Sequence, residues 1–430
     1  MSTPDANQTM RELLDRAIEI VDEALPPGTE YLTRRSGPVA TDITSVQLVQ
    51  DQFGILRWRI GDPPLVTPLS GRRMIQPNVV GEVIWEKEVR NLGTNTVVAM
   101  LQALDRRLNP NQGLRLLTGD GPVSWEGDMT AAKGPFLVLV HGTFSRTEAF
   151  IEEMSSIVEG REYLQWAMLN YGRIFAMDHS TISTNPFLNA LALSRLMNQN
   201  DAEVDVICHS RGGLVTRWWL EMLDREDRKR RRAIVVGSTL RGTSLAAPDR
   251  VRKGFDHMSN MIRAVGTVAS TIPFTAGISG LMSIAASCVG AAAHTPAVDA
   301  LFAMLPGLSA MSRIRNNTEL NQLQGMKGNS VEYFGVKSNF EPPEIDIWQF
   351  WHAFNSPFDR FKNALSDDFI FRDQENRRLA NDLVVDCESM QGIPPNQVKD
   401  WCDFGTSTTV HHTNYFAQPP TINFIRSILS

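Results

Sequence analysis

The chain has 430 residues, of which 42% are hydrophobic and 21% are charged, and its formal net charge at pH 7 is −6. This composition is ordinary for a folded globular protein. The negative balance argues against a general binder of nucleic acid or other polyanions. The length exceeds that of one typical domain, so we expect a large core domain with a second unit attached.

Four cysteines are spread through the chain without the close spacing of a metal site: Cys208, Cys288, Cys387 and Cys402. This usage favours a reducing compartment over a disulfide scaffold, although a bridge between Cys387 and Cys402 stays open. The first eleven residues are polar and lack the basic and then apolar run of a secretory signal. We therefore expect a cytoplasmic location.

The first 130 residues predict a small α+β unit. Apolar residues recur at helical spacing over 10–25, which indicates an amphipathic helix. Alternating and β-branched residues predict strands within 45–60 and 79–90, and a further helix is expected over about 94–108. Since this part contains no recognisable catalytic group, its role stays open.

After about residue 131 the sequence changes to continuous apolar runs separated by helical stretches. Five runs are bounded by turns and are expected to be buried strands: 136–140, 174–177, 204–208, 233–236 and 331–336. Such strands alternating with helices are typical of a parallel sheet that is covered on both faces. We predict an α/β fold, with a doubly wound, mostly parallel sheet over residues 131–430.

An apolar insertion separates the last two of these strands. Residues 264–293 contain no charged side chain, and their length permits a membrane-spanning segment. Repeated glycine and proline breaks and a modest hydrophobicity favour buried helices instead. We therefore expect two or three buried helices here, within an insertion at about 250–325.

The strand at 204–208 leads into a tight turn with the sequence Cys208-His209-Ser210-Arg211-Gly212-Gly213. A strand, a sharp turn and a helix in this order lift a serine hydroxyl clear of the sheet and hold its backbone in a strained conformation. Ser210 is therefore the candidate nucleophile.

A serine hydroxyl reacts only when a base removes its proton, an acid orients the base and backbone donors stabilise the oxyanion. The strand at 136–140 ends in a His-Gly turn, and we expect the backbone amides of Thr143 and Arg211 to form the oxyanion hole. Asp382, in a predicted loop-to-strand junction, is the candidate acid. The candidate base is one of two histidines near the C-terminus, His411 or His412. The order along the chain, serine then aspartate then histidine, is that of the α/β-hydrolase topology.

Two of these assignments have a rival nearby in the sequence. Asp386 is an alternative acid, but it lies within an apolar run that predicts a strand interior, so Asp382 is better sited. His411 and His412 both lie near the C-terminus, and a one-residue register between them is not fixed by sequence.

Together these segments resemble the lipase-type α/β-hydrolases. The resemblance rests on His141-Gly142-Thr143, the Ser210 turn, residues 237–243, residues 381–385 and the ending His412-Thr413-Asn414-Tyr415. It covers residues 135–430 and includes bacterial triacylglycerol lipases, GPI-inositol-deacylase-like proteins and related bacterial hydrolases. The resemblance implies a Ser-His-Asp triad that works through an acyl-enzyme, and the family's His-x-x-Tyr/Phe ending favours His412 as the base. It also implies that the insertion at about 250–325 is a helical cap.

The turn departs from the family pattern at its first position, where Cys208 replaces glycine. A thiol is small enough for a tight turn, but its Cβ makes the turn more open or more strained. Cys208 is also an alternative nucleophile. Its place at the strand end, behind the turn, favours a buried packing role.

The other polar motifs are expected to be structural. His209 belongs to the turn, His141 is expected to hydrogen-bond the oxyanion loop, and His179 is expected to be a satisfied loop histidine. The basic run 228–232 predicts a solvated loop, with peripheral contact to anionic lipid as the alternative. No metal or nucleotide motif is present in the sequence, so no cofactor is implied.

The sequence thus predicts a serine hydrolase that cleaves carboxylic esters, with an apolar or fatty acyl group suggested by the apolar insertion. Its expected partner is a small-molecule or lipid ester. Amidase and acyltransferase chemistry use the same groups. The alternative from a different class is a catalytically silent hydrolase fold that serves as a scaffold or binding module.

Overall fold

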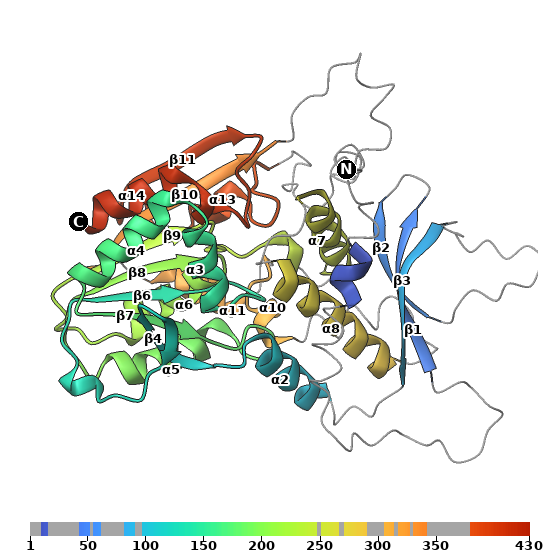
Figure 1. Ribbon diagram of the computed structural model, residues 1–430, viewed down its shortest axis with the longest axis horizontal. Coiled ribbons are helices and arrows are strands. Elements are labelled where there is room, and N and C mark those ends of the chain that lie inside the picture. The colour runs from blue at the N-terminus through green and yellow to red at the C-terminus, as the bar shows by residue number, and fades with distance from the viewer. Residues whose placement is uncertain are drawn as a thin grey trace, which may run out of the picture. The chain divides into compact units, whose positions relative to one another are not determined.

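A computed structural model of the chain describes residues 10–15, 43–51, 55–61, 81–90, 97–246, 251–265, 271–289, 305–313, 317–326, 330–341 and 379–430. The chain forms two compact units (Figure 1). Unit 1 comprises Met1–Leu104, Pro248–Ala303 and Ile345–Ile370, and unit 2 comprises Asp105–Ala247, Met304–Glu344 and Phe371–Ser430. Most of the segment expected as a cap therefore belongs to the same unit as the N-terminal strands.

Unit 1 contains a three-stranded antiparallel sheet in the order β2-β1-β3. Its strands are β1 Ile43–Asp51, β2 Leu56–Gly61 and β3 Gly81–Arg90, and its long helices are α7 Val251–Val265 and α8 Thr271–Val289. The strands agree with those predicted within 45–60 and 79–90. Residues 10–15 are helical, and the rest of the helix predicted over 10–25 lies outside the described residues.

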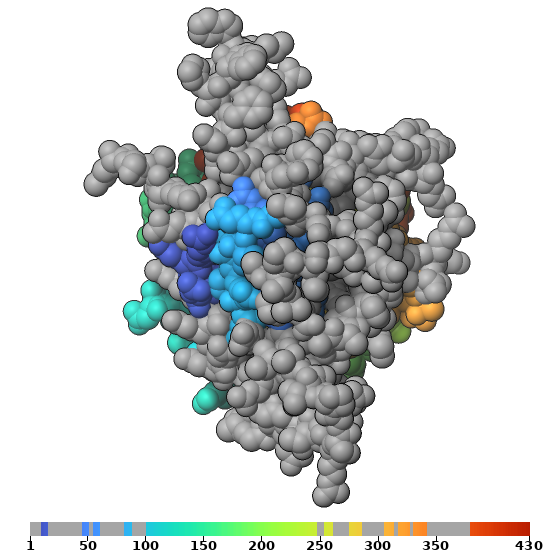
Figure 2. Space-filling model, turned by 90° about the vertical axis from the view of Figure 1, so that its right-hand side faces the viewer, coloured from blue at the N-terminus to red at the C-terminus, as the bar shows by residue number. Residues whose placement is uncertain are grey.

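The N-terminal helical residues lie against β3 on the face of unit 1 that Figure 2 presents. Arg11 Nε donates a hydrogen bond of 2.8 Å to the carbonyl oxygen of Ile84. Trp85 Nε1 donates one of 3.2 Å to Asp15 Oδ1. These contacts join the first described segment of the chain to the third strand of the sheet.

Helix α8 is one uninterrupted helix, although its sequence contains Pro273, Gly277 and Gly280. The proline lies in the first turn, where its missing N–H breaks no intrahelical hydrogen bond. Apolar side chains of α8, such as Leu281 and Met282, are buried, and the helix packs against all three strands of unit 1. Packing in this unit therefore accounts for the apolar composition of the segment. Among the described helices, none has the length and hydropathy needed to cross a bilayer.

Helix α7 closes the outer edge of β2 with polar side chains. Asn260 accepts a hydrogen bond from the Leu56 amide at 2.9 Å and donates one to the Leu56 carbonyl oxygen at 2.8 Å. Asp256, one helical turn earlier, accepts from the Trp58 amide at 2.6 Å. These side chains take the place of a neighbouring strand at an edge that would otherwise expose unpaired backbone groups.

Unit 2 is built on an eight-stranded sheet in the order β11-β10-β9-β8-β6-β7-β4-β5. The strands are β4 Gly113–Thr118, β5 Gly121–Ser124, β6 Phe136–Val140, β7 Arg173–Asp178, β8 Val204–His209, β9 Arg231–Val236, β10 Glu332–Phe340 and β11 Val398–Ser407. All neighbouring strands from β7 to β11 run parallel, and β4 pairs antiparallel with both β7 and β5.

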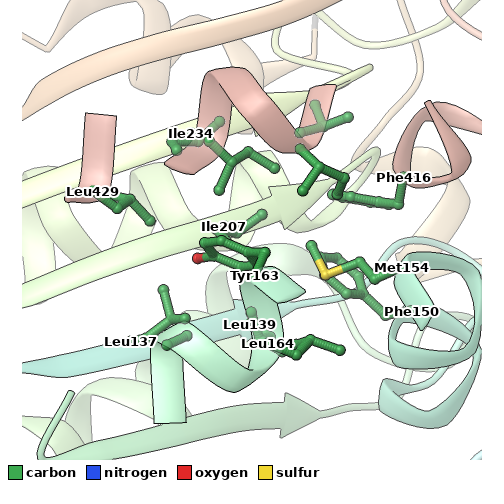
Figure 3. Close-up of a cluster of buried hydrophobic side chains, with 14 of the residues drawn as sticks. Leu137, Leu139, Phe150, Met154, Tyr163, Leu164, Ile207, Ile234, Phe416 and Leu429 are labelled. Carbon is green, nitrogen blue, oxygen red and sulfur yellow. The ribbon is translucent and has the colours of Figure 1, made fainter. Parts of the chain in front are cut away.

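Helices cover both faces of this sheet. On one face lie α3 Thr147–Ser155, α4 Val158–Asn170 and α14 Pro419–Leu429, whose apolar side chains form one core with alternate strand residues (Figure 3). Leu137, Leu139 and Ile207 point into this core, where they meet residues such as Phe150 and Phe416. Each such buried side chain contributes roughly 1.5–3 kcal/mol to folding.

The intervening strand residues, such as Val138, Val206 and Cys208, are equally buried and face the other side of the sheet, because side chains alternate along a strand. There the sheet is covered by α5 Pro186–Met197, α6 Gly212–Arg217 and the π-helix Trp218–Leu223. Burial on both faces explains why the strands read as continuous apolar runs. The predicted α/β fold, a doubly wound and mostly parallel sheet of the α/β-hydrolase type, is confirmed.

The sequence did not predict β4, β5 and β11. β11 forms one edge of the sheet, and its charged and polar residues are largely exposed, so it lacks the apolar run of a buried strand. The prediction of a strand around Asp386 is wrong. Residues 382–385 form bends, and Asp386 caps the short helix α13 Cys387–Met390 by accepting from the Ser389 amide at 2.8 Å.

Two further short helices lie in unit 2 within the expected cap, α10 Pro306–Ser309 and α11 Thr318–Gly325. Leu305 and Leu308, around the first of them, are buried. The Gly307 amide donates to the carbonyl oxygen of Ile182 at 3.0 Å. The 305–313 segment is therefore fixed to the loop that follows β7.

Candidate active site

The strand order of unit 2 reverses next to β6. The chain passes from β6 to β7 on one side and then crosses to β8 on the other. The loops after β6 and β8 therefore both begin at the carboxyl ends of the strands but run in opposite directions. In α/β sheets, the crevice at such a switch point, outside the carboxyl ends of the strands, is where ligands bind. The His-Gly turn after β6 and the Ser210 turn after β8 both lie there.

Ser210 has a positive φ of 54°, a conformation that is strained for a residue with a side chain. The start of α6 packs closely on the end of β6, and a Cβ on Gly212 would collide with the carbonyl oxygens of Val140 and His141. Glycine is therefore required there. The strained serine and the close helix form the sharp strand-to-helix turn predicted from the sequence.

Cys208 occupies the position where the family pattern has glycine. It is fully buried, and its thiol lies 3.5 Å from the carbonyl oxygen of Ile234 on the neighbouring strand. Burial raises the pKa of the thiol to about 12. A protonated, buried thiol is a poor nucleophile, so these observations favour the packing role.

The structure brings Asp382 and His412 into direct contact. His412 Nδ1 lies 2.8 Å from Asp382 Oδ2, and both side chains are buried. The carboxylate also accepts hydrogen bonds at Oδ1 from the amides of Val384 and Val385, at 3.1 and 2.8 Å. Because Nδ1–H faces the carboxylate, the neutral ring has its lone pair at Nε2, the atom able to accept a proton.

Tyr415 is a further partner of Asp382 that was not assigned a role from the sequence. Its hydroxyl donates a hydrogen bond of 3.0 Å to Asp382 Oδ2, the oxygen that also faces His412. Gly237 makes room for this arrangement: its φ is 51°, and a Cβ there would come within 2.6 Å of the Tyr415 ring and 3.2 Å of Asp382 Oδ2. Tyr415 thus fixes the orientation of the Asp382 carboxylate.

The loop that carries His412 is held from two other elements. His209 Nε2 lies 2.9 Å from the His412 carbonyl oxygen, and the two rings are 4.7 Å apart. The Phe416 amide donates to Glu153 Oε1, on α3, at 2.9 Å. Burial lowers the pKa of His209 well below its usual value, so His209 is a neutral support of the loop.

Within the described residues, the Ser210 hydroxyl makes no hydrogen bond. Catalytic hydrogen bonds are often long in structures without substrate.

The two rival residues face other partners. His411 Nδ1 lies 3.2 Å from Thr413 Oγ1, and burial lowers the pKa of His411 to about 4. Asp386 forms an ion pair with Arg313, with 2.6 Å between Arg313 Nη1 and Asp386 Oδ2. Of the two histidines and two aspartates, the structure joins His412 to Asp382.

Two backbone amides of interest follow neighbouring strands, one in the loop after β6 and one in the turn after β8. Among the described residues, the amides of Thr143 and Arg211 donate to no protein acceptor. The next amide, that of Phe144, donates to Thr181 Oγ1 at 3.2 Å, and Phe144 has a positive φ of 54°. The two unpaired amides follow β6 and β8, which are neighbouring parallel strands.

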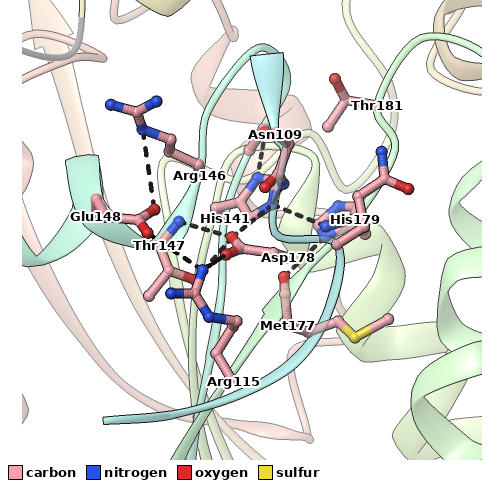
Figure 4. Close-up of polar contacts among 12 residues, drawn as sticks. Asn109, Arg115, His141, Arg146, Thr147, Glu148, Met177, Asp178, His179 and Thr181 are labelled. Carbon is pink, nitrogen blue, oxygen red and sulfur yellow. Dashed lines mark hydrogen bonds and ion pairs between the residues drawn. The ribbon is translucent and has the colours of Figure 1, made fainter. Parts of the chain in front are cut away.

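His141 anchors this loop through a buried polar cluster (Figure 4). Its Nε2 accepts hydrogen bonds from the His179 amide at 3.2 Å and Asn109 Nδ2 at 3.1 Å. An accepting Nε2 places the proton on Nδ1, which donates to the Gly142 carbonyl oxygen at 2.9 Å. Burial also lowers the pKa of His141. His141 is therefore a neutral ring that bonds the loop, as expected from the sequence.

The remaining partners of this cluster are structural. Asp178 accepts from the amide and hydroxyl of Thr147, each at 2.8 Å, and from Arg115 Nη1 at 2.9 Å. His179 stacks on His141, with 4.1 Å between ring centroids, and its Nδ1 lies 3.0 Å from the Met177 carbonyl oxygen. Asn109 and Arg115, which support the loop, carry no recognisable motif in the sequence.

The basic run 228–232 is largely neutralised by ion pairs. Arg228 and Arg231 both contact Asp224, with nitrogen-to-oxygen distances of 3.0 and 2.8 Å. Arg232 contacts Asp205 at 2.8 Å, and Arg230 also pairs with acidic side chains. Lys229 is exposed. The run is therefore not a free cationic face.

Within the described part of the chain, no group of three or more histidine, cysteine or acidic side chains is arranged to hold a metal ion. Cys208, Cys387 and Cys402 are free thiols there.

Residues 116–430 match the family described as Domain of unknown function (DUF7379). The chain belongs to this family. No curated protein matches the sequence.

Several solved structures are similar to parts of the chain. Lipase BlEst2 from Bacillus licheniformis, in its propeptide form, is 13% identical over 70% of this chain and 50% of its own, with a TM-score of 0.36. Phospholipase PlaB from Legionella pneumophila is 13% identical over 60% and 46%, with a TM-score of 0.34. Lipase 1 from Pelosinus fermentans is 13% identical over 68% and 98%, with a TM-score of 0.41. The chain spans about half the length of the first two.

Proposed function

We propose that the protein is a serine hydrolase that cleaves carboxylic esters. One observation carries the proposal: a serine with a strained, positive φ stands at the switch point of an α/β-hydrolase sheet that also carries a buried Asp382–His412 pair and two unpaired backbone amides. In this proposal, the reacting groups all belong to unit 2.

In the proposed reaction, each group acts once while the acyl-enzyme forms and once while it is hydrolysed. Ser210 Oγ attacks the ester carbonyl carbon while His412 Nε2 takes the hydroxyl proton. The same proton passes to the leaving alcohol oxygen as the acyl-enzyme forms, and a water molecule repeats the sequence to release the acid. Asp382 stabilises the imidazolium, and the Thr143 and Arg211 amides stabilise the oxyanion, each by roughly 10²–10³-fold in rate.

We propose an ester with an apolar acyl group as the substrate. Met311 supports this choice, because its sulfur lies 3.6 Å from Thr143 Oγ1, beside the proposed oxyanion loop. The apolar insertion predicted from the sequence includes helix α8, which packs against the unit 1 sheet. This helix therefore does not support the choice of an apolar acyl group. A small-molecule or lipid ester satisfies the same chemistry.

The ion pairs of the basic run do not support peripheral membrane contact, because a paired charge attracts anionic lipid weakly. We expect binding to anionic vesicles to be unchanged when Lys229 and Arg230 are replaced by alanine. A cytoplasmic location stays our expectation, in keeping with the dispersed cysteines.

Labelling with a fluorophosphonate probe tests the function directly. Wild-type protein is expected to react at one site, and Ser210→Ala is expected to abolish both labelling and ester hydrolysis. Cys208→Ala is the matched control, because it changes the neighbouring strand residue and should keep the labelling. A folded wild-type protein that does not react would contradict the proposal and support the scaffold alternative. A series of esters of increasing acyl length then defines the substrate.

A further inference from the structure

The side chain of Arg211 is a buried charge without a close carboxylate. The residue is fully buried, and the one hydrogen bond of its guanidinium runs from Nη2 to the Thr184 carbonyl oxygen at 2.6 Å. Its Nε and Nη1 are buried without a partner. Among the described residues, no acidic oxygen lies within ion-pair distance of this side chain. Such a group is costly to bury, so its position calls for a reason.

The two acidic side chains that act on the pKa of Arg211 make hydrogen bonds to other partners. Asp105 accepts four hydrogen bonds from the loop after β7, from the amides of residues 181–183 and from Ser183 Oγ. Glu319 Oε1 accepts from Asn185 Nδ2 at 2.8 Å, while its Oε2 is buried without a partner. Both act on Arg211 only through space, as attractions that partly offset the effect of burial on its pKa.

The guanidinium nevertheless stays charged at neutral pH, because burial lowers its pKa only to about 10. Its charge also lowers the pKa values of His141 and His179, which lie beneath the proposed oxyanion loop. Among the described residues, this charge thus has no ion-pair partner. The same residue contributes the unpaired amide that follows Ser210.

We propose that the Arg211 side chain supplies a fixed positive charge that stabilises the oxyanion formed at Ser210, in addition to the hydrogen bond from the Arg211 amide. A charge buried in a low-dielectric interior acts over a longer distance than the same charge in water. It needs no reorganisation when the negative charge develops, because the bond to Thr184 holds the guanidinium in place. The inference rests on the proposed hydrolase function and names a residue that tunes it.

Three variants separate this electrostatic role from a purely structural one. Arg211→Met removes the charge and keeps much of the side-chain volume, while Arg211→Lys keeps a charge. The backbone amide is retained in both. Glu319→Gln removes a nearby negative charge but keeps the acceptor for Asn185. The probes are a p-nitrophenyl ester and an alkylboronic acid, whose adduct with a serine is tetrahedral and anionic.

We expect Arg211→Met to lower kcat by about 10- to 100-fold, with little change in KM, and to weaken boronic acid binding in parallel. Arg211→Lys should lose roughly fivefold or less. Glu319→Gln should change in the opposite direction, with boronic acid binding about two- to fivefold tighter, because it removes a negative charge that acts on Arg211.

A folded Arg211→Met protein with wild-type kcat and boronic acid affinity would overturn the inference. So would equal losses in the Met and Lys variants, which indicate a structural anchor for the loop at Thr184. If Arg211→Met does not fold, Glu319→Gln decides, because a structural role predicts no tighter binding of an anion. Failure of the hydrolase function itself is distinguishable, since the wild-type protein would then show no fluorophosphonate labelling at Ser210.

Discussion

Two buried histidines of unit 2, His412 and His141, differ in whether a ring nitrogen is available to accept a proton. His412 directs Nδ1–H at the carboxylate of Asp382, 2.8 Å away, and its Nε2 is left to accept a proton. His141 uses Nε2 to accept from the His179 amide and Asn109, and Nδ1 to donate to its own loop. The first ring has an atom available for proton transfer, while the second has both nitrogens occupied.

The acids beside the two rings differ in the same way. Asp382 has backbone amides, a tyrosine hydroxyl and His412 as its partners, with no arginine or lysine at ion-pair distance among the described residues. Asp178 is paired with Arg115, and its nearest oxygen is 3.5 Å from His141 Nε2. A carboxylate already neutralised by an arginine contributes little to stabilising an imidazolium. The acid's other partners, and not the residue type, therefore decide which histidine can serve as a base.

The largest expected effect comes from His412. His412→Gln should lower kcat for ester hydrolysis by roughly 10³- to 10⁴-fold, because no group then removes the serine proton. The neighbouring variant, His411→Gln, should stay within about threefold of the wild type. Initial rates with a p-nitrophenyl ester measure both. Equal losses in the two variants would contradict the assignment.

Asp382→Asn should follow, with kcat reduced by roughly 10³-fold, since an amide neither stabilises the imidazolium nor fixes the Nδ1–H tautomer. Asp386→Asn keeps an acceptor for the helix cap but removes the ion pair with Arg313, so it should lower the melting temperature while leaving kcat per folded molecule within a few-fold. Measuring kcat beside thermal unfolding separates the two. The reverse pattern would make Asp386 the acid.

Asp178→Asn tests the other histidine. It removes one of the two carboxylates that pair with Arg115, leaving Glu148 at 3.2 Å, and should cost about 2 kcal/mol of stability, measured by urea unfolding. We expect kcat per folded molecule to fall by about tenfold at most, because His141 keeps its two donors and its bond to Gly142. A loss of activity as large as that of Asp382→Asn would show that the Asp178 cluster takes part in proton transfer.

The smallest expected effect is a pH dependence of stability from Glu153, which holds the loop after His412. Burial raises the pKa of this carboxyl to about 8, above its ordinary value near 4.5. The stability it contributes is therefore complete below about pH 4.5, falls as the pH rises, and is lost above about pH 8. Against Glu153→Gln, the free energy of unfolding of the wild type should decrease progressively over this range. Urea unfolding at several pH values measures the difference, and parallel curves would contradict it.

Much of unit 2 could be predicted because its strands are buried on both faces. The runs at 136–140 and 233–236 are apolar at every position, and the run at 204–208 is apolar except at Asp205. Each corresponds to a strand of the sheet. The edge strand β11 and the bends at 382–385 could not be found this way. An exposed edge needs no apolar run, and short-range hydrogen bonds set the bends without leaving a periodic pattern.

The sequence by itself determined the order and spacing of the motifs: a His-Gly turn after one buried strand, a serine in a tight turn after another, and an aspartate and two histidines downstream. Only the tertiary structure decided which of them meet. In the folded chain His412 contacts Asp382, and Asp386 caps a helix and pairs with Arg313. The apolar helix α8 packs in the core of unit 1. The reason is physical. Local sequence patterns determine which residues are buried and where the chain turns, whereas the partner of a side chain depends on residues that lie far away in the sequence.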